Sequence, residues 1–101
     1  MKIVNGVPIE TKTKQICMAN TLEIEVGTNG HCGGNSSNGC RTYFRIQDLS
    51  STDIEVSING GPSVNMMSSG PIEIVLGGDN ELDSFIKALE FAARTLKKQS
   101  K

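Results

Sequence analysis

The spacing of apolar residues changes at Gly77-Gly78, and this change constrains the fold more than any other feature of the chain. Before this point several segments alternate apolar and polar residues, which is typical of strands with one buried face. After it, apolar residues recur three and four positions apart, as in an amphipathic helix. That stripe consists of Leu82, Phe85, Ile86, Leu89, Ala92, Ala93 and Leu96. The pattern therefore predicts strands followed by one long C-terminal helix.

The predicted helix covers residues 79–98. Asp79 or Asn80 is placed to be its N-cap, because a short polar side chain can accept hydrogen bonds from the free amides of a first helical turn. Glu81 and Asp83 place negative charge at the positive end of the helix dipole. The last turns carry the opposite charge, on Arg94, Lys97 and Lys98.

The alternating segments predict an antiparallel β-meander. Strands are expected at about 21–27, 41–48, 53–59, 63–67 and 71–77, with a possible N-terminal hairpin at 2–10. Asn-Gly pairs recur between these segments and favour tight turns, because both residues tolerate positive φ. The predicted fold class is α+β: a single domain, residues 1–101, in which a meander of about four to six strands packs the helix on one face.

Charged residues on the polar face of this sheet invite two interpretations. Glu23, Glu25 and Glu55 could stand opposite Arg41 and Arg45 on neighbouring strands. Such cross-strand pairs stabilise a sheet by roughly 0.2–1 kcal/mol each. Exposed ion pairs are common and weak, so we interpret these as structural contacts rather than as a charged binding surface.

Length and charge exclude several classes of function. The 101 residues suit one domain, and ten Lys and Arg against eleven Asp and Glu leave a net charge of -1. This balance gives no strong signal for nucleic acid or for an anionic membrane. The chain lacks an apolar run of the roughly 18 residues that a membrane-spanning helix needs, and its start lacks a signal-peptide core. We expect a soluble, cytoplasmic protein.

Three cysteines and one histidine are the candidate metal ligands and nucleophiles. Cys17, His31, Cys32 and Cys40 are residue types that bind zinc, but no Cys-x-x-Cys pair anchors a site. Cys32 and Cys40 could form a disulfide under oxidising conditions. His31 and Cys32 are chain neighbours, which rarely have the geometry of a catalytic pair, and a third orienting group is missing. We expect no metal, no cofactor and no enzymatic activity.

A long glycine-rich loop, residues 27–40, separates two of the clearest predicted strands. Loops of this length are often functional. Its backbone amides could hold an anionic nucleotide, with Arg41, Tyr43 or Arg45 completing the site. The alternative is a flexible loop or one that contacts a protein partner.

Phe91 lies outside the apolar stripe of the predicted helix, roughly 180° from Leu82 at about 100° per residue. A large aromatic among small neighbours could contact another chain, either a second copy or a target. It could equally be covered by the N-terminal hairpin or by Met66-Met67, or be an ordinary exposed aromatic. The candidate partner-binding residues are Asn29, His31, Asn35, Arg41, Tyr43, Arg45 and Phe91.

Two stretches, GCRTYFRI at 39–46 and GGDNELDSFIKALEFA at 77–92, resemble small accessory proteins of bacteriophages and prophages. The resemblance implies a non-catalytic protein in the cytoplasm of a bacterial host that inhibits a host protein, such as a CRISPR nuclease, by direct binding. Proteins of this kind also include sponges for nucleotide signals, so a sponge that uses the glycine-rich loop is the alternative. A structural or oligomerisation module is a second alternative.

Overall fold

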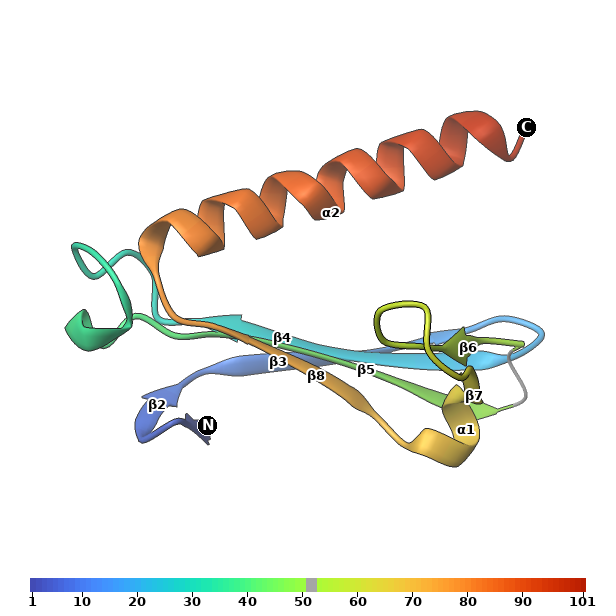
Figure 1. Cartoon of the computed structure of the whole chain (residues 1–101), viewed down its shortest axis with the longest axis horizontal. Coiled ribbons are helices and arrows are strands. Elements are labelled where there is room, and N and C mark those ends of the chain that lie inside the picture. Colours follow the sequence, from blue (N-terminus) through green and yellow to red (C-terminus); the bar gives the residue numbers. More distant parts are fainter. Residues whose placement is uncertain (51–52) are drawn as a thin grey trace.

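The computed structural model describes residues 1–50 and 53–101, and it confirms the predicted α+β fold (Figure 1). The main sheet has four antiparallel strands in the order β3-β4-β5-β8. These strands are β3 (Thr11–Cys17), β4 (Thr21–Thr28), β5 (Thr42–Ser50) and β8 (Ile72–Leu76). The long helix α2 (Asp79–Gln99) follows β8 and lies over one face of the sheet.

Smaller elements complete the fold. At the N-terminus, β1 (Lys2–Val4) and β2 (Val7–Ile9) form a hairpin. Its turn places Asn5 at φ 47° and Gly6 at φ 80°, the left-handed backbone that the Asn-Gly pair predicts. The remaining short elements are η1 (Ser36–Asn38), β6 (Glu55–Val56), β7 (Val64–Asn65) and α1 (Met66–Ser69).

The structure differs from the predicted strands in two places. It adds β3, which pairs with β4 along its whole length although its own sequence carries few large apolar residues. The strands predicted at 53–59 and 63–67 are wrong in extent. They shorten to β6 and β7, which pair only with each other, and residues 66 and 67 begin α1 instead. Asn65 explains that change, because its side chain accepts from the amide of Met67 and caps the helix.

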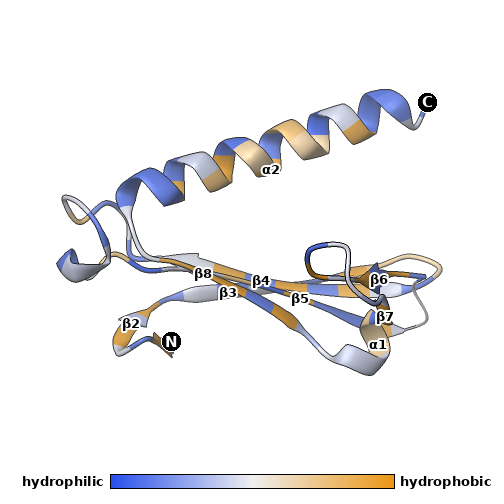
Figure 2. Ribbon diagram, viewed as in Figure 1, coloured by the Kyte–Doolittle hydropathy of each residue, from blue (hydrophilic) through white to orange (hydrophobic). Residues whose placement is uncertain are grey.

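One face of the main sheet is apolar. On β4, Leu22, Ile24 and Val26 share this face, since alternate residues of a strand point the same way. Val26 pairs with Phe44 of β5, which in turn pairs with Ile74 of β8. Helix α2 lies on this side, and its apolar segments turn toward the sheet (Figure 2).

The other face of the sheet carries a charged cluster. Arg45 lies between Glu23 and Glu25, with nitrogen to oxygen distances of 2.7 and 3.1 Å. These two pairs confirm the predicted cross-strand contacts of Arg45. The pairings predicted for Arg41 and Glu55 are wrong: Arg41 donates to backbone carbonyls, and Glu55 lies in β6, outside the main sheet.

The best buried apolar cluster also lies on this second face, under the N-terminal hairpin. It consists of Val4, Ile9 and Tyr43, each at most 5% exposed. The Tyr43 hydroxyl donates to Glu73 on the neighbouring strand, and the ammonium of Lys2 lies 4.7 Å from the centre of its ring. This cluster therefore lies on the side of the sheet away from α2. None of the helices in the described residues is long and apolar enough to cross a membrane.

Candidate functional site

An apolar trough separates α2 from the sheet. We define it by Val26 and Phe44 on the sheet and by four residues of the helix, and it contains an open cavity of about 260 Å³. The helix residues are Leu82, Phe85, Ile86 and Leu89. Figure 1 shows that α2 starts close to the sheet and runs farther from it toward its C-terminus.

The tightest packing of α2 against the sheet is in the first turns of the helix. The side chain of Leu82 is buried, and the ring of Phe85 meets Phe44 edge to face with centroids 5.4 Å apart. Further along, Ile86 is 45% exposed and Leu96 is 65% exposed. Leu82 is the single buried residue of α2, every residue of which the structure describes. Much of the stripe predicted to pack on the sheet is thus open to solvent.

Helix α2 is also much longer than the strand that precedes it. Helix α2 has 21 residues, which at 1.5 Å each span about 31 Å. Strand β8 has 5 residues and spans only about 17 Å. The second half of α2 therefore extends past the strand that leads into it.

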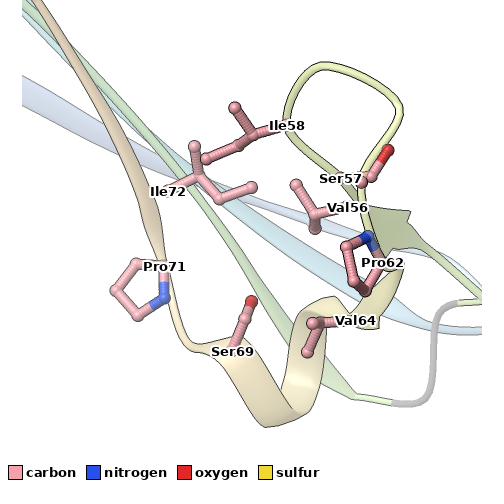
Figure 3. A pocket seen from close by; sticks show the side chains of 9 residues that line it. Val56, Ser57, Ile58, Pro62, Val64, Ser69, Pro71 and Ile72 are labelled. Carbon is pink, nitrogen blue, oxygen red and sulfur yellow. The ribbon is translucent and has the colours of Figure 1, made fainter.

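A second groove opens on the same face of the sheet (Figure 3). Its cavity measures about 340 Å³ and is lined by apolar side chains that include Val56, Ile58 and Ile72. Ile72 pairs with Ile46, which is two residues from Phe44 and so shares its face. Ile58 is 87% exposed at the rim. The uncovered apolar surface thus extends beyond the trough.

The glycine-rich loop is fastened to the start of α2 by Asp79. Its carboxylate accepts from the amides of Cys32 and Gly33, both at 2.9 Å, and of Gly34 at 3.0 Å. In return the Asp79 amide donates to the carbonyl of Gly34. These bonds, that to the Cys32 amide foremost, lower the pKa of Asp79. The predicted N-cap role of Asp79 or Asn80 is wrong, because Gly78 occupies that position and Asp79 holds the loop.

His31 adds a second tie between the loop and the helix. Its Nε2 lies 2.8 Å from a carboxylate oxygen of Asp83, and both side chains are more than half exposed. The hydrogen bond to Asp83 is the main cause that raises the pKa of His31, and the negative charges of Asp83 and Asp79 add to it.

Two of the cysteines meet at one backbone carbonyl of the loop. The thiols of Cys40 and Cys32 point to the carbonyl oxygen of Gly30 at 3.2 and 3.7 Å. Cys40 is fully buried, and this burial raises the pKa of its thiol. Cys17 is exposed at the end of β3. Within residues 1–50 and 53–101, no cluster of His, Cys, Asp and Glu is suited to hold a metal ion.

Three other candidate residues form hydrogen bonds within the glycine-rich loop. The Asn29 side chain accepts from the amide of Arg41 and donates to the carbonyl of Gly39. Asn35 accepts from Ser37 and caps η1. The Arg41 guanidinium donates to two carbonyls of the loop. Their contacts explain how the loop keeps its shape.

Tyr43 and Arg45 lie on the opposite face of the sheet, in the buried cluster and the charged cluster described above. Burial, together with the Glu73 contact, raises the pKa of Tyr43 to about 12. The structure therefore does not bring these two side chains to the loop amides. The amides of residues 32–34 are in turn occupied by Asp79.

Phe91 is 61% exposed on α2, so neither the N-terminal hairpin nor Met66-Met67 covers it. By helical geometry it points away from the sheet, opposite Leu82.

The predicted site omitted Asp79 and the trough. No local sequence pattern marks the trough, because it depends on how far α2 stands from the sheet. No protein-family model matches this chain, and neither does any curated protein or any solved structure.

Proposed function

We propose that this chain is a small non-catalytic binding protein that acts by direct contact with another polypeptide, and that α2 is its binding element. The supporting observation is the uncovered apolar stripe. Ile86, Leu89 and Leu96 are 42 to 65% exposed in a row along one side of the helix. An apolar row of this kind matches the anchors by which amphipathic helices recognise protein surfaces.

The outer side of α2 offers a second contact. Phe91 is exposed there, and aromatic side chains are enriched in the cores of protein interfaces. Near the start of the helix, the tie between His31 and Asp83 holds the glycine-rich loop beside it. Helix and loop would thus present one continuous surface to a partner.

The target class that we propose comes from the resemblance to phage and prophage accessory proteins. It is a host protein of a bacterium, such as a CRISPR nuclease, inhibited by being bound in the cytoplasm. The contacts described above give less support to a nucleotide sponge, because Asp79 already occupies the loop amides that would hold the anion.

Affinity capture from a bacterial lysate, followed by mass spectrometry, tests the proposal. The bait is the full chain, run beside Leu89→Glu on the stripe and Phe91→Ala on the outer side. We expect wild type to retain a protein that at least one variant loses, since the two changes remove different surfaces of one helix. If all three baits retain the same proteins, α2 is not the binding element.

A further inference from the structure

We propose that the polypeptide covering the apolar trough is a second copy of this chain, in a two-fold symmetric dimer whose α2 helices pack antiparallel. The inference builds on the proposed function, because it names the partner of the uncovered stripe. It leaves Phe91 on the outside of the dimer, free for a different partner.

The surface area of the chain supports a missing partner. The chain exposes 6983 Å² at a mass of 10.8 kDa. A compact monomer of that mass exposes about 5,500 Å², so the excess is about 1,500 Å². A standard interface covers about 800 Å² on each partner. The excess is therefore large enough to supply a stable dimer interface.

The shape of the chain agrees with its area. Its radius of gyration is 15.1 Å, whereas a compact domain of this length has about 13 Å. Helix α2 diverges from the sheet (Figure 1), and a helix held away from the rest of a chain increases its radius of gyration. The sheet residues Val26 and Ile74 are 41 and 39% exposed and could be covered by a second helix beside α2. The open side of the molecule is thus apolar on both its walls.

The charges of α2 favour an antiparallel partner of the same sequence. The helix begins with Asp79, Glu81 and Asp83 and ends with Arg94, Lys97 and Lys98. In a two-fold arrangement the acidic start of one helix faces the basic end of the other. A parallel pair would place like charges side by side. The helix is therefore complementary to its own reversed copy.

The sizes of the stripe residues show the same complementarity. On the two sides of Leu89, Phe85 and Ile86 are large and Ala92 and Ala93 are small, while both ends of the stripe, Leu82 and Leu96, are leucine. Reversal about Leu89 sets the large residues of one helix opposite the small residues of the other. Alternation of large and small side chains across an interface is what close helix packing requires. This self-complementarity is the reason to choose a second copy over an unrelated protein.

Size-exclusion chromatography with light scattering tests the dimer on the full chain. We expect wild type to have twice the 10.8 kDa mass of the chain. Leu89→Glu should raise the dissociation constant at least about 100-fold, because it places a charge at the centre of the contact. Phe91→Glu is the matched control on the other side of the same helix and should leave the mass unchanged. Circular dichroism is the control that checks whether both variants keep the wild-type fold.

A charge reversal tests the antiparallel direction. Changing Arg94, Lys97 and Lys98 to Glu makes both ends of α2 acidic. An antiparallel dimer should then weaken about tenfold at low salt and recover partly at high salt, because ions screen the repulsion. A dimer that is unchanged at low salt contradicts the antiparallel arrangement.

Two results overturn the dimer itself: a wild-type mass of 10.8 kDa at every concentration, or a Leu89→Glu variant that is folded and still dimeric. The capture experiment separates this failure from that of the proposed function. If wild type is monomeric and captures a protein that Leu89→Glu does not, the second copy alone is refuted. A dimer that captures no other protein with any bait refutes the host target alone.

Discussion

At the scale of single residues, Asp79 joins the glycine-rich loop to the first turn of α2. Two of its three loop bonds, those from the amides of Gly33 and Gly34, end on the same carboxylate oxygen. In Asp79→Asn one of the two carboxylate oxygens is replaced by an NH₂ group, which cannot accept from an amide. We expect this variant to be less stable than wild type at neutral pH, as measured by thermal unfolding.

The pH dependence of that difference identifies its cause. The pKa of Asp79 is lower in the folded chain, so the stability it contributes is present above its unfolded pKa and is lost as pH falls through its folded pKa. Wild type and Asp79→Asn should therefore converge in acid. Glu90→Gln on the same helix is the control and should match wild type throughout. A difference that persists unchanged in acid would assign the effect to packing rather than to the carboxylate.

His31 titrates in the opposite sense. Its pKa is raised by Asp83, so the stability of this tie is fully present below the unfolded pKa of His31 and is lost as pH rises through the folded pKa. His31 is the only histidine of the chain, which makes its ring signal in an NMR titration unambiguous. We expect Asp83→Asn to lower the pKa of His31 toward its ordinary value, and Glu90→Gln to leave it unchanged. An equal pKa of His31 in wild type and in Asp83→Asn would refute the tie between His31 and Asp83.

The two thiols at the Gly30 carbonyl predict a disulfide under oxidation. Cys32 and Cys40 approach the same oxygen from different parts of the loop, so little movement is needed to join them. In a Cys17→Ser background, mild oxidation should remove the mass of two hydrogen atoms from the intact chain. Adding Cys32→Ser should abolish this change. Retention of both thiols in the oxidised Cys17→Ser chain would show that the loop keeps them apart.

At the scale of elements, the N-terminal hairpin depends on one side chain of β5. Tyr43 packs against Val4 and Ile9 and donates to Glu73. Tyr43→Ala should lower the free energy of unfolding by about 3–5 kcal/mol, because it leaves a cavity beneath the hairpin. Tyr43→Phe should cost only about 1 kcal/mol, the value of the hydrogen bond. Urea unfolding measures both, and equal losses in the two variants would argue against hairpin packing as the main contribution.

The predictability of each element depended on how much of its pattern was local. Strands β4, β5 and β8 and helix α2 carry their own apolar periodicity, and all four were predicted near their observed bounds. Strand β3 was missed because Lys12 and Lys14 occupy its apolar-face positions, and its pairing with β4 decides its conformation. The capping of α1 by Asn65 and the role of Asp79 depend on contacts between segments, which a local pattern does not contain. For the same reason no local pattern shows that the glycine-rich loop is tied to α2, on the side of the sheet opposite to Tyr43 and Arg45.

At the scale of the whole molecule, the chain has its buried apolar cluster on one side of the sheet and its uncovered stripe on the other. A domain of this size gains its stability from burying apolar surface, and here part of the apolar surface is open to solvent. A second copy that covers the trough would therefore add stability as well as a symmetric shape. The fold and the assembly become linked in this arrangement.

That linkage predicts a stability that depends on protein concentration. A second copy that binds the folded chain but not the unfolded one stabilises the folded state by mass action. The midpoint of thermal unfolding of wild type should therefore rise with protein concentration. Leu89→Glu should unfold at a constant and lower midpoint, because the charge removes the contact without touching the buried cluster of Val4, Ile9 and Tyr43. Phe91→Glu should follow wild type, since its side chain lies on the outer side of α2. A wild-type midpoint that is independent of concentration would mean that the chain is stable with its trough open.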